Sequence, residues 1–192
     1  QGWGGSLFFV AASIDEKSRT VTGETLGTSA TNWSGMRVRP SFLTKFVNKP
    51  SDFEGKTAEQ IRAMDIDDRA MIWGVDHKLG LGKNDAFKQG LTIVKWNNVY
   101  SNHGTTHDTF CVDTDFFLFR VAEAYLNAAE AEMHLNGANS AKAKGWIDAL
   151  RKRAHAEPRS TYSLEDVLDE RARELYCEGF RRTDLIRYNQ FG

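Results

Sequence analysis

The chain has 192 residues and a net charge of -1, with 41% hydrophobic and 27% charged residues. This composition is ordinary for a globular protein with a sizeable core, and no apolar run approaches the ~18 residues of a membrane-spanning helix. Because basic and acidic residues are mixed along the chain, no basic patch predicts nucleic-acid binding.

The two cysteines, Cys111 and Cys177, are too few for a disulfide framework, and their spacing fits no metal motif. We expect two buried thiols, with a bridge between them as the alternative. The chain starts at Gln1 without a signal peptide and stops at Gly192 without a clear terminal element. We therefore expect a fragment whose targeting signal or lipid anchor lies outside it.

Residues 1–115 are expected to form a loop-rich region with short helices and strands. Apolar runs such as Leu7–Val10 and Leu91–Trp96 stand between Gly-, Ser-, Thr-, Asn- and Asp-rich segments, which is typical of isolated strands. Short helices are predicted at Ser41–Val47 and Thr57–Met64, where a Ser or Thr can cap the first turn. Since long loops in a compact domain are often functional, we expect this region to bind the ligand.

Residues 116–192 are expected to be helical, with a first helix over Phe116–Leu135 that Gly137 ends. Its apolar arc is wide enough to predict burial against more than one neighbour. The predicted faces are an apolar face of Leu118, Val121, Ala122, Tyr125, Ala129 and Met133, an alanine face of Ala124, Ala128 and Ala131, and a polar strip of Arg120, Glu123, Asn127 and Glu130.

A second helix is predicted to follow Ser140 and to run to about Ala154. Gly145 lies inside it, where glycine is unfavourable by roughly 1 kcal/mol relative to alanine, and this predicts a tight contact. The short connection predicts an antiparallel hairpin similar to one tetratricopeptide unit. One such unit cannot bury both of its faces, so we expect other units elsewhere in the full protein.

A third helix is predicted from Ser163, with Asp166 in a capping-box position, to about Glu178, where Gly179 breaks it. A short helix, about Asp184–Asn189, follows, and Thr183 is its expected cap.

Charged residues fall within the apolar face of the third helix. Arg171 and Glu178 lie in the middle of the face that Leu164, Val167, Leu168 and Leu175 define, and Glu174 lies at its edge. A charge that faces a core must be paired, so we predict a partly buried arginine–carboxylate network joining the last two helices. The alternative is that Glu174 and Glu178 form the acid/base pair of a glycoside hydrolase. The surrounding arginines disfavour it, because a general acid needs a raised pKa.

Three ordered segments resemble motifs of the SusD/RagB family. They are Asp115–Ala131, similar to "DF-L-R-AE-YL--AEA", Ile147–Ala154, similar to "iN-iR-RA", and the blocks Asp169–Leu175, Glu178–Arg182 and Asp184–Arg187, similar to "ER-REL--EG-R--DLIR". Asn32–Arg37, Asp68–Arg69 and Lys95–Asn97 resemble further family features more loosely. The resemblance covers most of the chain from about Leu7 onward.

The resemblance implies a mainly α-helical, SusD-like fold, in which tetratricopeptide-like hairpins carry a long loop-rich region with few short strands. It implies a surface-exposed lipoprotein of the outer membrane that binds oligosaccharide or polysaccharide and delivers it to a SusC-like TonB-dependent transporter. It implies neither catalytic residues nor a cofactor. Family members are much longer than this chain. A tetratricopeptide-type scaffold for protein segments and a glycoside hydrolase remain the alternatives.

Tryptophans in the loop-rich region are the candidate sugar platforms, because sugars present flat apolar faces and rings of hydroxyl groups. Trp33 is the first candidate, with Asn32, Arg37 and Arg39 around it, and Trp3 and Trp73 complete the set. The alternative is that these tryptophans pack the loops onto the helices, and we prefer it for Trp73 and Trp96. Trp146 lies on the apolar face of a predicted helix and is set aside.

Two polar clusters contain residue types that can bind metal ions. His103 and His107 with Asp108 have no third ligand at fixed spacing, and the EF-hand pattern is absent around Asp65, Asp67 and Asp68. We therefore predict no metal site.

Overall fold

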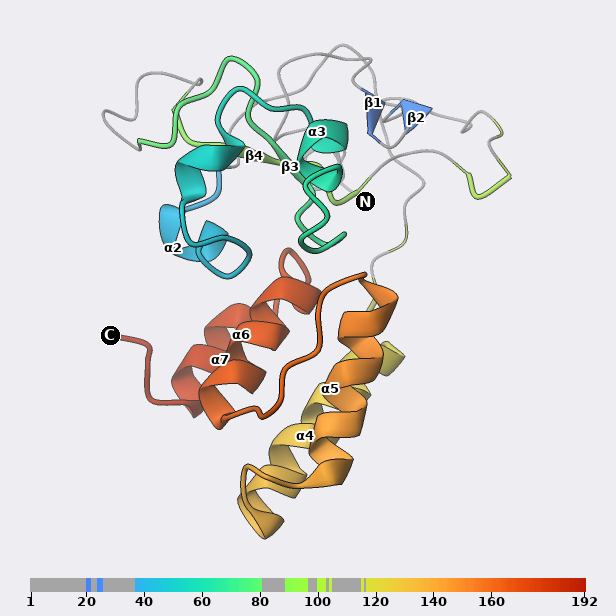
Figure 1. Cartoon of the computed structure of the whole chain (residues 1–192), viewed down its shortest axis with the longest axis vertical. Helices are drawn as coiled ribbons and strands as arrows, with labels where there is room; N and C mark the ends of the chain where they lie inside the picture. The colour runs from blue at the N-terminus through green and yellow to red at the C-terminus, as the bar shows by residue number, and fades with distance from the viewer. Residues whose placement is uncertain are drawn as a thin grey trace. The chain divides into compact units, whose positions relative to one another are not determined.

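The computed structural model of the chain describes residues 37–80, 89–96, 100–102, 104, 115 and 117–192, together with the backbone of 20–21 and 24–25. It divides into two compact units (Figure 1). Unit 1 comprises Gln1–Met64 and Ala70–Asp115, and unit 2 comprises Asp65–Arg69 and Phe116–Gly192. Helices predominate in the described part and strands are short, so the predicted mainly α-helical class is confirmed. None of the helices in these ranges combines the length and the apolar character needed to cross a bilayer.

The described part of unit 1 holds three short helical segments. Helix α2 (Pro40–Leu43) is shorter than predicted and begins at a proline without a side-chain cap, because the fixed φ of proline suits the first helical position. The 3₁₀-helix η1 spans Pro50–Phe53. Helix α3 (Ala58–Arg62) confirms the predicted cap: Thr57 accepts a hydrogen bond from the Gln60 amide, and the Gln60 side chain accepts one from the Thr57 amide.

The strands in the described part of the chain are each two residues long. Strand β1 (Thr20–Val21) pairs antiparallel with β2 (Glu24–Thr25), and β3 (Ile72–Trp73) pairs antiparallel with β4 (Thr92–Ile93). The strand predicted over Leu91–Trp96 is therefore present but shorter. The strand predicted at Leu7–Val10 lies outside the described residues.

The backbone after β3 passes very close to the chain after η1. The Gly74 amide donates to the Lys56 carbonyl at 2.8 Å, and the Gly55 amide donates to the Gly74 carbonyl at 2.9 Å. A Cβ atom at Gly74 would lie 2.1 Å from the Phe53 carbonyl oxygen, which no real side chain tolerates. Glycine is thus required at this position for the two segments to pair.

Unit 2 begins with an α-hairpin (Figure 1). Helix α4 (Val121–Asn136) ends at Gly137, whose φ of 86° fits the predicted stop, and α5 (Ala141–Arg153) follows Ser140 as predicted. The expected start of α4 at Phe116 is wrong, because the backbone of Arg120 is extended. The tight contact expected at Gly145 is also absent: an added Cβ there would meet no atom within 4 Å.

The faces of α4 differ from the prediction. Ala122, Ala129 and Met133 are buried as expected, but Val121 is 68% exposed, Leu118 precedes the helix and is exposed, and Tyr125 is 37% exposed. Glu130, assigned to the polar strip, is buried. The reason is that α4 packs against α5 and α6 on a face centred near Leu126, about 140° around the helix from Val121.

The chain ends with α6 (Leu164–Leu175) and α7 (Arg181–Arg187). The predicted capping box is confirmed, since Ser163 and Asp166 bond reciprocally. Helix α6 stops before the predicted Glu178, because Tyr176 is extended and its hydroxyl donates to the Arg69 carbonyl. Helix α7 starts earlier than expected, after Phe180, and Thr183 lies within it rather than capping it; its hydroxyl donates to the Phe180 carbonyl.

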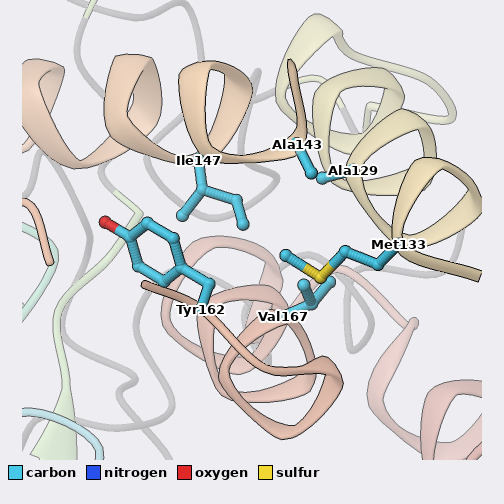
Figure 2. Packing of buried hydrophobic residues seen from close by; sticks show 6 residues of the cluster. All are labelled: Ala129, Met133, Ala143, Ile147, Tyr162 and Val167. Carbon is cyan, nitrogen blue, oxygen red and sulfur yellow. The ribbon is translucent and has the colours of Figure 1, made fainter. Parts of the chain in front are cut away.

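The core of unit 2 lies where α4, α5 and α6 meet (Figure 2). Ala129 and Met133 from α4 contact Ala143 and Ile147 from α5 and Val167 from α6. Tyr162 closes this cluster, and its hydroxyl donates to Asp148 at 2.6 Å. Burial and the hydrogen bond to Asp148 raise the pKa of Tyr162 to about 12. Cys177 is partly exposed, not buried as expected, and Cys111 lies outside the described residues.

Candidate functional site

Of the six candidate glycan-binding residues, three are within the described ranges and all three belong to unit 1. Arg37 and Arg39 flank Val38, which is buried and donates its amide to the Leu91 carbonyl at 2.9 Å. This bond ties the segment to the start of β4, while Arg39 remains exposed and Arg37 partly exposed. Trp3, Asn32 and Trp33 lie outside the described residues, so their position relative to the arginines stays a prediction.

Trp73 lies in an apolar cluster of unit 1. It is only 6% exposed and packs with Ala58 and Val94, and its carbonyl accepts a hydrogen bond from the Thr92 hydroxyl. Trp96 is partly exposed, with the Lys95 ammonium 5.4 Å from the centre of its ring. A sugar platform needs an open ring face, so the burial of Trp73 favours the packing role.

Unit 2 contains a buried network of arginines and carboxylates. Its centre is Glu170 on α6, which is fully buried, with Oε2 accepting hydrogen bonds from Arg151 at 2.9 Å and Arg173 at 2.6 Å. Its Oε1 lies 2.7 Å from Nη1 of Arg69. The predicted network is therefore present, and it reaches well beyond the last two helices.

Arg69 is held by carboxylates from two parts of the sequence. Its Nε and Nη2 donate to Asp67 at 2.9 and 2.8 Å, and its Nη1 donates to Glu174 at 3.0 Å. These contacts, with those to Glu170, fasten residues 65–69 to α6. They also raise the pKa of Arg69 in spite of its burial, so the guanidinium stays charged.

Glu174 and Glu178 share the side chain of Arg120. Arg120 donates to Glu174 Oε1 at 2.6 Å and to both carboxylate oxygens of Glu178 at 2.6 and 2.8 Å. Burial alone would raise the pKa of Glu174, but hydrogen bonds from Arg153 and Arg120 and the charge of Arg69 lower it to about 2. A carboxyl group with this pKa is ionised at neutral pH and is unsuited to general acid catalysis.

A second cluster connects α4, α6 and α7. Arg171 lies 2.9 Å from Asp184 and donates to Asn127 at 2.6 Å. Arg187 donates to both carboxylate oxygens of Glu130, at 2.7 and 2.8 Å. Burial would raise the pKa of Glu130, but its bond with Arg187 lowers it. Glu130 is thus buried on α4 because α7 supplies its partner.

Residues 53–191 match the SusD family. Over its whole length the chain is 33% identical to the starch-binding protein SusD of Bacteroides thetaiotaomicron, and over 71% of its length it is 33% identical to the SusD-like protein P25 of Formosa agariphila. This chain belongs to the SusD family. It spans 38% of the length of the first of these relatives and 24% of the second.

The fold agrees with that of a solved structure. The surface glycan-binding protein A of Bacteroides uniformis superposes with a TM-score of 0.60 over 97% of this chain and 36% of its own, at 21% identity. At this identity the likeness supports the fold and not the ligand.

The SusD family motifs supply the buried network. Arg120 comes from the first motif, Arg151 and Arg153 from the second, and Glu170, Arg173 and Glu174 from the third. Sequence reasoning anticipated the network on α6 but missed the contributions of Arg69, Arg151 and Arg153. The available signal was that each of these arginines stands inside a segment that resembles a family motif.

Among the described residues, no group of three His, Cys, Asp or Glu side chains could hold a metal ion. Asp67 is engaged by Arg69, and His155 Nδ1 lies 2.8 Å from Asp68. His103, His107 and Asp108 lie outside the described residues.

Proposed function

We propose that this chain is part of a non-catalytic SusD-family protein that binds extracellular oligosaccharide or polysaccharide. The observation that carries the proposal is the 33% identity, over the whole chain, to a protein named for starch binding. In this proposal the protein is a surface-exposed lipoprotein of the outer membrane, and it delivers the glycan to a SusC-like TonB-dependent transporter.

The chemistry of the described carboxylates supports binding rather than hydrolysis. A glycosidase needs one carboxyl group that is protonated near neutral pH and faces a second across the sugar bond. Glu174 is ionised and bound by several arginines, and Glu178 shares Arg120 with it. These contacts make both residues structural in the proposed function.

We place the ligand site in residues 1–115, with Trp33 as the stacking platform and Asn32, Arg37 and Arg39 as hydrogen-bonding groups. Arg37 and Arg39 support this choice, because their segment is fastened to β4 through Val38 while Arg39 is exposed. A fixed backbone that presents the exposed guanidinium of Arg39 can offer donors to sugar hydroxyls at little entropic cost.

The test is affinity electrophoresis of the chain in gels that contain starch or one of a panel of other polysaccharides, with released reducing sugar followed in parallel. Retardation by one glycan without sugar release is the expected result. Sugar release would contradict the non-catalytic role. Migration unchanged by every glycan would contradict capture by this chain and favour the protein-binding scaffold.

Two tryptophan variants separate binding from packing. We expect Trp33→Ala to lose retardation and to keep the melting temperature of the parent chain. We expect Trp73→Ala to lower the melting temperature, because its ring is buried against Ala58 and Val94. A destabilised Trp33→Ala variant would instead assign Trp33 to the core.

A further inference from the structure

Residues 65–69 belong to unit 2, although their neighbours in the sequence belong to unit 1. Unit 1 includes Met64 at one end of this stretch and Ala70 at the other. The stretch joins α3 to β3, whose residues Ala58 and Trp73 pack in the same apolar cluster. We call residues 65–69 the strap. Its contacts are made in one unit, while the elements at both of its ends belong to the other.

Unit 2 holds the backbone of the strap as well as its side chains. The Asp68 amide donates to the carbonyl of Ala154, at the end of α5, at 2.9 Å. The hydroxyl of Tyr176, which directly follows α6, donates to the Arg69 carbonyl at 2.8 Å. Both Arg69 and Tyr176 are buried. Because backbone groups are bonded in addition to the guanidinium of Arg69, unit 2 fixes the path of the chain through the strap.

Little slack separates the strap from β3. Only Ala70 and Met71 stand between Arg69 and the first residue of the strand, Ile72. The Ile72 amide donates to the Ala70 carbonyl at 2.9 Å, so this connection is turned rather than extended. Even a fully extended chain spans at most about 3.6 Å per residue. A fixed Arg69 carbonyl therefore limits where β3 can begin.

Backbone hydrogen bonds continue from β3 to the segment that bears the two candidate arginines. The Met71 carbonyl accepts from the Val94 amide at 3.0 Å, and β3 pairs with β4. Leu91 directly precedes β4, and its carbonyl accepts from the Val38 amide at 2.9 Å. Residues 37–39 are thus connected to the strap by successive backbone bonds. Such a contiguous series of bonded segments can carry energetic coupling between distant positions.

We propose that the strap sets the position of β3 and, through β4, that of residues 37–39. Arg69 and Tyr176 are then positioning residues for the exposed guanidinium of Arg39. The part of the proposal that concerns glycan capture by Arg39 rests on the proposed function, whereas the positioning of the backbone does not. The alternative is that the strap is only a connection, and that unit 1 keeps its local structure when the strap is loosened.

Two tyrosine variants of the whole chain separate these possibilities. Tyr176→Phe removes the hydrogen bond to the Arg69 carbonyl and keeps the ring. The matched control is Tyr162→Phe, because Tyr162 is also a buried tyrosine of unit 2, but its hydroxyl donates to Asp148 and not to the strap. Each variant loses one buried hydroxyl, so a general loss of stability in unit 2 affects both.

Hydrogen exchange followed by mass spectrometry measures the effect at the amides of Val38 and Val94. In Tyr176→Phe these amides should exchange about fivefold faster than in the parent chain, the factor expected for the loss of one hydrogen bond. In Tyr162→Phe they should exchange at the parent rate. Unchanged exchange in Tyr176→Phe overturns the proposal. So does the same acceleration in both variants, because it would come from stability alone.

Affinity electrophoresis of the same variants tests the consequence for glycan capture. A glycan that retards the parent chain should retard Tyr176→Phe less and Tyr162→Phe equally. Full retardation of Tyr176→Phe in spite of faster exchange at Val38 would overturn the role of the strap in binding. A parent chain that no glycan retards would contradict the proposed function, while the exchange rates would still decide whether the strap positions β3 and β4.

Discussion

The two units of this SusD-family chain are stabilised in different ways. Unit 2 combines an apolar core with a buried ionic network: Glu170 and Glu174 are buried on α6 and accept hydrogen bonds from arginines of distant segments. The described part of unit 1 consists of short elements with a close backbone approach, with Gly74 against Phe53 and an apolar cluster around Trp73. The comparison teaches that the segments resembling the family motifs hold an ionic network in unit 2, whereas the described part of unit 1 relies on backbone pairing and apolar packing.

The largest effect is expected from Arg69→Met. It removes the guanidinium shared by Asp67, Glu170 and Glu174 and leaves buried carboxylates short of a partner. Loss of one partner of a buried ion pair typically destabilises by about 3–5 kcal/mol. Urea unfolding followed by the far-ultraviolet helix signal measures the change. Arg182→Met, at an exposed position of α7, is the control and should stay within about 0.5 kcal/mol of the parent.

Acidification should weaken unit 2 through Glu174. Its pKa is about 2 in the folded chain against a usual value of 4.5, so its contribution is complete above pH 4.5 and is lost as the pH falls toward 2. The shift corresponds to roughly 3 kcal/mol. Urea midpoints measured between pH 7 and pH 2 should fall less steeply for Glu174→Gln than for the parent. The same pH dependence of the urea midpoint in both chains would contradict the stabilising role of ionised Glu174.

Gly74→Ala tests the backbone contact of unit 1. The added methyl group would meet the Phe53 carbonyl, and relief requires the paired segments to separate, at a cost of about 1–3 kcal/mol. Tryptophan fluorescence on heating should report a lower transition temperature. Gly80→Ala is the control, because nothing lies within 4 Å of its position. Equal transition temperatures for the two variants would argue against the close approach.

The smallest expected effect is a gain in stability. Gly145→Ala puts a better helix former at an exposed position of α5 with open space around it and should stabilise unit 2 by about 0.5–1 kcal/mol. Gly137→Ala should destabilise it, because the φ of 86° at Gly137 disfavours a side chain. Urea unfolding of the two variants measures both changes in the free energy of unfolding.

Sequence reasoning predicted the helices of unit 2 well, because their stop and start signals are local. Ser163 with Asp166 marks the start of α6, and Gly137 marks the end of α4. It misplaced the start of α4 because Arg120 is extended where its side chain binds Glu174 and Glu178, and no local pattern encodes that distant contact.

The faces of α4 were harder to predict for a related reason. Periodicity counts every valine as apolar and therefore predicts a buried Val121, whereas the structure leaves it 68% exposed. The same pattern predicts an exposed Glu130, because its partner Arg187 lies 57 residues away in the sequence. Trp33 and Asn32 remain predicted glycan-binding residues. The structure shows that Arg39 is exposed and Arg37 partly exposed, and their role in glycan binding is also a prediction.

The residues that fasten Arg69 also impose an order on folding. Asp67 is two residues from Arg69, whereas Glu174 is 105 residues further along the chain. During synthesis Asp67 is available at once as a counter-ion, but Glu174 emerges only after α4 and α5 have been made. Closing so long a loop carries a large entropic cost, and contacts of this separation slow folding. We therefore expect the ionic core of unit 2 to assemble last, after its hairpin.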